Sequence, residues 1–109
     1  MISDVTNRFL TYISYDTQSK EGAEEMPSTR SQLALAEKLA EELTQMGASQ
    51  VRMDAYGYVY AKIPSNTNRD IPALGFIAHM DTAPALSGKD VKPQIIHNYD
   101  GGAICLNAE

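Results

Sequence analysis

The feature that most constrains the fold is an unbroken apolar run over residues 71–78 that leads directly into His79-Met80-Asp81. Because the run is apolar at odd and even positions alike, both faces of an extended strand would need cover. Such a strand is typical of the centre of a sheet with helices on both sides. We therefore expect an α/β fold with His79 and Asp81 at the carboxyl end of a buried strand, where ligand sites gather in open α/β sheets.

The first residues of the chain carry a helical pattern. Between Ile2 and Tyr15 the apolar positions recur at steps of three and four, and Ser3 or Asp4 can serve as an N-cap. Residues 16–27 have no hydrophobic period and include Gly and Pro, so we expect a loop there.

A second and stronger helical pattern follows this loop. Its apolar stripe consists of Leu35, Leu39, Leu43 and Met46. Ser28 or Thr29 can cap its beginning, and Gly47 is typical of its end. We expect this helix to pack on a sheet and to turn its acidic back toward water.

The hydrophobic period then changes to two. Residues 50–54 and 58–63 flank turn-forming residues 54–57 and predict two antiparallel strands. The alternation of Tyr56, Tyr58 and Tyr60 could form a stacking platform for bases, but without basic residues around it we favour ordinary strand packing. Residues 94–96 and 103–106 are also strand-like, and we expect Cys105 to be a small apolar filler.

Composition excludes several classes of partner and location. The net charge is -5, with scattered Lys and Arg, so we expect neither a nucleic acid nor an anionic membrane as partner. Asp4, Arg8 and Asp16 interrupt any signal peptide, and no apolar run approaches the length of a membrane span. The single cysteine allows no intrachain disulfide. We expect a cytoplasmic protein.

The candidate chemistry lies in the His79–Asp81 pair. Residues two apart on an extended strand project to the same face, and a carboxylate beside an imidazole can fix its tautomer and make it a better metal ligand or base. The same pair could instead be a hydrogen-bonded core histidine beside a capping aspartate. Zinc needs three or four protein ligands, and the other histidine, His97, is expected at the surface beside a turn. A serine hydrolase is not supported, because the chain has no GxSxG motif.

Several segments taken together resemble the peptidase T family, tripeptide aminopeptidases of the co-catalytic zinc metallopeptidase superfamily that includes carboxypeptidase G and the aminoacylases. The resemblance covers nearly the whole chain and is more specific than the HxD pair alone. The segments that carry it are residues 14–19, 27–29, 54–64 and 75–82, with shorter pieces at 70–73, 87–89, 91–95, 98–99 and 101–102.

The resemblance implies an enzyme that releases the N-terminal residue of tripeptides with two zinc ions bridged by a carboxylate. His79 would be the first histidine ligand, and Asp81 would be the catalytic-site residue that orients its imidazole. The family's other metal ligands, its general base and its dimerisation domain would lie downstream of this chain. The resemblance is compatible with a homodimer for the whole enzyme.

We therefore expect residues 1–109 to be the N-terminal portion of a three-layer α/β/α zinc-peptidase catalytic domain, a mixed sheet with flanking helices. The coding sequence is expected to continue past Glu109, and the 109-residue chain alone is expected to be inactive. Two alternatives stay open. One is another member of the superfamily, a dipeptidase, acylase or carboxypeptidase; the other is a non-enzymatic α/β binding module with a structural HxD pair.

Overall fold

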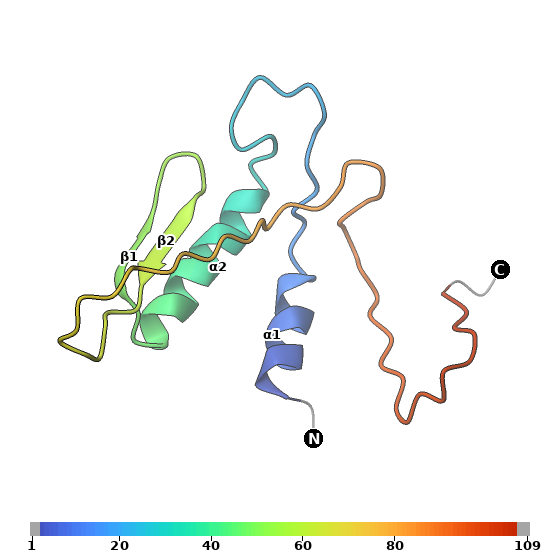
Figure 1. Cartoon of the computed structure of the whole chain (residues 1–109). Coiled ribbons are helices and arrows are strands. Elements are labelled where there is room, and N and C mark those ends of the chain that lie inside the picture. Colours follow the sequence, from blue (N-terminus) through green and yellow to red (C-terminus); the bar gives the residue numbers. More distant parts are fainter. Residues whose placement is uncertain (1–2, 107–109) are drawn as a thin grey trace.

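The computed structural model describes residues 3–106 and contains, in chain order, two helices and a β-hairpin (Figure 1). The elements are α1 (Asp4–Tyr12), α2 (Gln32–Gln45), β1 (Ser49–Met53) and β2 (Val59–Lys62). This is a small α/β arrangement in which the hairpin packs against α2. After β2 the described chain crosses in front of the hairpin and α2 in this view and then continues without helices or strands (Figure 1).

Helix α1 begins where the sequence predicts it. The Ser3 side chain accepts a hydrogen bond from the backbone N–H of Thr6 at 3.2 Å and so caps the first turn. The helix ends at Tyr12, short of the predicted Tyr15, and the backbone N–H groups of Ser14 and Tyr15 bond carbonyls three residues back in a tightened turn. Ile2, the first apolar position of the predicted pattern, lies outside the described residues.

Helix α2 begins later than predicted. Its N-cap position is Ser31, which makes no side-chain capping bond, so the prediction of a cap at Ser28 or Thr29 is wrong. The hydroxyls of those two residues bond the preceding loop instead. At the other end the prediction is confirmed. Gly47 follows the C-cap with a φ of +83°, and the N–H groups of Gly47 and Ala48 close a Schellman motif on the last carbonyls.

The predicted hairpin is confirmed. Strands β1 and β2 are antiparallel, with Met53 opposite Val59, and Asp54 organises the turn. One carboxylate oxygen of Asp54 accepts the backbone N–H groups of Tyr56 and Tyr58, both at 3.0 Å. Gly57 turns the chain with a φ of +85°, a conformation that favours glycine.

The two helices are joined by a polar cluster. The Glu42 carboxylate accepts hydrogen bonds from Tyr12 at 2.6 Å and from Arg8 at 2.9 Å, while Lys38 lies 3.5 Å from its other oxygen. The Tyr12 hydrogen bond is the largest cause that lowers the pKa of Glu42, and Lys38 and Arg8 add to it. Burial, followed by the bond to Glu42, raises the pKa of Tyr12.

The predicted buried strand over residues 71–78 is wrong for this structure. The segment has no regular secondary structure, and Phe76 and Ile77 are fully or almost fully exposed. A strand that is apolar on both faces needs strand neighbours and covering helices, and the sheet of the described chain has only the two strands of the hairpin. Without those partners the run remains in water.

The region beyond residue 81 also differs from the predictions. Residues 94–96 and the described residues 103–106 form no strand, and Cys105 is exposed rather than a buried filler. Leu35 and Ala36 are the buried hydrophobic residues of the described chain. The radius of gyration is 17.6 Å, whereas a compact domain of this length has about 13 Å. The molecule is therefore open, with a small core between α2 and its neighbours.

Candidate functional site

The His79 and Asp81 side chains meet, as their spacing predicts. The Nδ1 atom of His79 lies 3.0 Å from Oδ1 of Asp81 and 2.9 Å from the backbone carbonyl oxygen of Asp81. A carbonyl oxygen can only accept a hydrogen bond, so Nδ1 carries the proton. In the neutral ring the lone pair is then on Nε2, the arrangement of a metal-binding histidine whose other nitrogen is held by a carboxylate.

The pair is accessible. The His79 side chain is 85% exposed and that of Asp81 is 43% exposed. The imidazole therefore does not behave as a satisfied core histidine in this structure, and its Nε2 atom can reach a ligand from solvent. The backbone of the residue that follows Asp81 is held against another segment.

That segment is the loop after α1, residues 17–19. Gln18 and Thr82 form a parallel β-bridge, in which the Thr82 N–H donates to the Thr17 carbonyl at 3.0 Å and the Ser19 N–H donates to the Thr82 carbonyl at 2.9 Å. Side chains reinforce the bridge. The Ser19 hydroxyl donates to the same Thr82 carbonyl at 2.8 Å, and the Gln18 amide donates to the Pro84 carbonyl at 2.8 Å.

The loop is tied in turn to the beginning of α2. Thr29 donates its hydroxyl to the Gln18 carbonyl at 2.8 Å, and the Ser28 hydroxyl accepts the N–H of Lys20 at 3.1 Å. The Gln32 side chain, which is buried, bonds both hydroxyls. A continuous set of hydrogen bonds therefore leads from α2 to the residue that follows Asp81.

A third segment approaches the same place at Gly88. A Cβ atom built there would lie 2.9 Å from Oδ1 of Asp16, 3.3 Å from the backbone nitrogen of Gln18 and 3.3 Å from the Thr82 hydroxyl. The first distance is shorter than side chains tolerate, so Gly88 permits a close approach that any larger residue would disturb. The turn after Asp81 thus returns onto the bridge.

The bridge between residues 17–19 and Thr82 was not predicted from the sequence. Residues 16–27 have no hydrophobic period and are expected to form a loop, which they do, and several of them form hydrogen bonds with other segments. The available signal was the density of hydroxyl and amide side chains in and just after the loop. Those groups satisfy backbone atoms that no helix or strand would pair.

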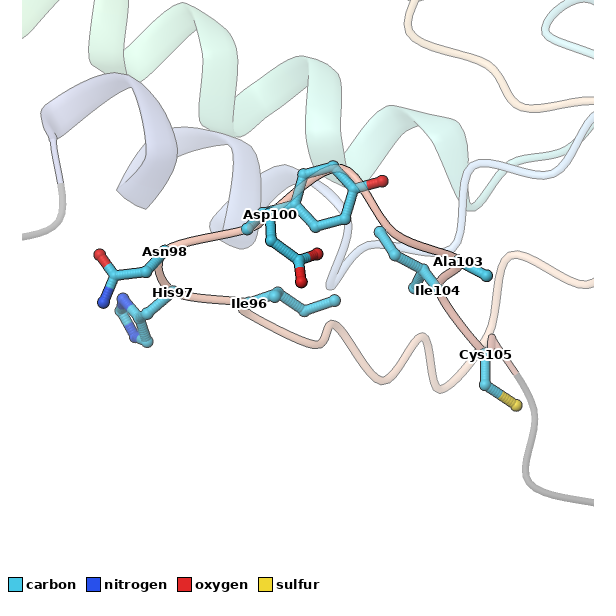
Figure 2. A pocket seen from close by; sticks show the side chains of 8 residues that line it. Ile96, His97, Asn98, Asp100, Ala103, Ile104 and Cys105 are labelled. Carbon is cyan, nitrogen blue, oxygen red and sulfur yellow. The ribbon is translucent and has the colours of Figure 1, made fainter.

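The described residues do not form a complete metal site. Residues 3–106 contain no group of three or more His, Cys, Asp and Glu side chains placed to hold a metal ion. His97 is exposed, as expected, and lies on a loop around an open hollow of about 370 Å³ (Figure 2). Neither His79 nor Asp81 lines that hollow. The donor chemistry of His79 and Asp81 fits one zinc ligand and its orienting partner, and the other ligands would have to come from elsewhere.

The chain is similar over nearly its whole length to curated proteins named peptidase T. The protein of Clostridium novyi is 55% identical over 105 residues, that of Halothermothrix orenii 51% over 106, and that of Caldanaerobacter subterraneus subsp. tengcongensis 54% over 108. Peptidase T proteins are homologues of this chain. The alignments cover 96%, 97% and 99% of the chain.

The chain spans about a quarter of these peptidase T relatives, 26% of the length of each. No family model matches it. Among the helices of residues 3–106, none is long and apolar enough to cross a membrane.

Proposed function

We propose that this chain is the N-terminal portion, residues 1–109, of the catalytic domain of a zinc-dependent tripeptide aminopeptidase. The observation that carries the proposal is the identity of about half the residues with peptidase T proteins over nearly the whole chain. The HxD geometry supports it, because Nδ1 of His79 is held by Asp81 and leaves Nε2 for a metal. The proposal includes a cytoplasmic location and a peptide substrate.

The proposed whole domain is a three-layer α/β/α sandwich in which residues 71–78 become a central strand. Support comes from the apolar run itself, whose exposed residues require neighbours that the described chain does not contain. Further chain would supply the remaining metal ligands, the general base and any surface for a homodimer.

In this proposal His79 binds one zinc ion through Nε2, and Asp81 orients the ring by accepting the Nδ1–H. Zinc, when bound, polarises the scissile carbonyl and activates the attacking water near neutral pH. Asp81 also keeps the ring in the tautomer that can act as a ligand. The 109-residue chain alone should be inactive, because it supplies too few ligands for the site.

The test uses the longer protein and two variants. His79→Ala should lose one zinc ion and most of the tripeptide hydrolysis, whereas Asp81→Asn should remain folded and keep part of its metal. Loss of an orienting partner typically weakens metal affinity or activity about ten- to a hundredfold. Metal content, tripeptide hydrolysis and circular dichroism are measured for both variants.

Full zinc occupancy and near-normal hydrolysis in a folded His79→Ala protein would overturn the proposal and leave His79 with a structural role. A stop codon directly after Glu109 in the gene would also overturn it, and would favour the non-enzymatic binding module. Hydrolysis of dipeptides, acylated amino acids or C-terminal residues in place of tripeptides would point to another branch of the superfamily.

A further inference from the structure

We infer that the loop of residues 17–19 is a positioning element for the His79–Asp81 pair, with Ser19 and Gln18 as its positioning side chains. The inference rests on the proposed function only for its consequence in catalysis. Its structural part concerns contacts within this chain.

The first step is the location of the contacts. His79 bonds the backbone carbonyl of Asp81 as well as its carboxylate, at 2.9 and 3.0 Å. The direction of that carbonyl depends on the peptide bond between Asp81 and Thr82. Contacts that fix the Thr82 backbone therefore help to fix the Asp81 carbonyl oxygen, which accepts the hydrogen bond from Nδ1 of His79.

The second step is how the Thr82 backbone is fixed. Its N–H and its carbonyl are both taken up by the 17–19 loop, and the carbonyl accepts two donors from Ser19, the backbone N–H at 2.9 Å and the hydroxyl at 2.8 Å. Gln18 extends the hold to the Pro84 carbonyl at 2.8 Å. Both peptide groups of Thr82 are therefore held, the one that joins it to Asp81 through its N–H and the one that follows it through its carbonyl.

The third step is that the loop is itself anchored. Thr17 is buried, and Thr29 at the entry to α2 bonds the Gln18 carbonyl. By contrast, residues 71–78 on the other side of His79 have no secondary structure. In this structure the pair is therefore positioned from the 17–19 loop rather than from the apolar segment that precedes it.

The experiment uses the 109-residue chain and the double variant Ser19→Ala with Gln18→Ala, which removes two side-chain donors and leaves the backbone bridge. Nitrogen-15 spectra at mildly alkaline pH report which imidazole nitrogen carries the proton. The chain has two histidines, so His97 serves as an internal control. Amide exchange at Thr82 reports the bridge itself.

We expect amide exchange at Thr82 to accelerate about tenfold, since each lost hydrogen bond contributes modestly. The His79 signal should move from the Nδ1–H tautomer toward the mixture of an unconstrained ring, while His97 stays unchanged. In the variant that carries Gln18→Ala, Ser19→Thr in place of Ser19→Ala keeps the hydroxyl. The changes in Thr82 exchange and in the His79 tautomer should then be about half of those in the double variant, or less. Gln45→Ala, at an exposed position of α2, should change neither.

Two results would overturn the inference. Faster exchange at Thr82 with an unchanged His79 tautomer would give the loop a structural role only, and unchanged exchange would mean that the side chains do not hold the bridge. If the double variant loses helix by circular dichroism, the two single variants give the same comparison. In the longer protein, kcat and zinc content should fall while KM for a tripeptide changes little. An inactive longer protein would refute the proposed function without touching the tautomer result.

Discussion

At the scale of single residues, one hydrogen-bond acceptor, the Asp81 carbonyl oxygen, determines which ring nitrogen of His79 carries the proton. The carbonyl of Asp81 can only accept a hydrogen bond, so the proton lies on Nδ1 and the lone pair of the neutral ring lies on Nε2. Sequence spacing alone predicted that the two side chains would meet. It could not predict the second acceptor, because the direction of a backbone carbonyl depends on the contacts of the following residue.

One prediction at this scale concerns zinc. The 109-residue chain should bind zinc only weakly, above micromolar dissociation constants, because structural and catalytic sites use three or four protein ligands. His79→Ala should remove most of that weak binding, whereas His97→Ala, the matched control, should remove little. Calorimetric titration measures this, and stoichiometric nanomolar binding would show that further ligands lie within the chain.

At the scale of elements, the sequence patterns correctly predicted the features that depend only on contacts between neighbouring residues. The cap at Ser3, the Schellman end at Gly47 and the Asp54 turn each need only a few consecutive residues, and each is confirmed. The cap at Ser28 or Thr29 failed because those hydroxyls bond Lys20 and Gln18 of the preceding loop, and α2 begins only after Ser31. The strand over residues 71–78 failed for the same kind of reason, since a central strand depends on partners and not on its own residues.

The contact between α1 and α2 yields a pH prediction. The hydrogen bond from Tyr12 lowers the pKa of Glu42 below its ordinary value of 4.5. The stabilisation from this carboxylate should therefore be complete above that pH and be lost as the pH falls through the lower, folded-state pKa. Thermal unfolding followed by circular dichroism across the acidic range measures the effect.

A pair of variants isolates that contribution. Glu42→Gln should cost about 1 kcal/mol near neutral pH, because it replaces a charged acceptor with a neutral one, and it should flatten the pH dependence. Glu41→Gln changes an exposed neighbour on the same helix and should behave as the unaltered chain. Equal acid sensitivity in both variants would assign the effect to groups other than Glu42.

At the scale of the whole molecule, the accessible surface is the informative quantity. It is 9603 Å², whereas a folded monomer of this mass exposes roughly 6,000 Å². Exposed apolar residues beyond the hairpin contribute to it, among them Leu74, Phe76 and Ile77. Under the proposed function, other chain would cover this apolar surface in the whole domain.

The substitution Ile77→Lys distinguishes the described chain from the proposed whole domain. In the 109-residue chain Ile77 is fully exposed, so the change should alter the free energy of unfolding by no more than about 0.5 kcal/mol. In the longer protein the same lysine would lie in a central strand and should cost at least about 3 kcal/mol, because it buries an unpaired charge. Leu35→Ala, in the small core of the chain, should destabilise both proteins by about 2 to 5 kcal/mol. Denaturant unfolding of both proteins measures the difference. An equally small effect of Ile77→Lys in the longer protein would mean that residues 71–78 stay at the surface there, and the three-layer domain would have to be abandoned.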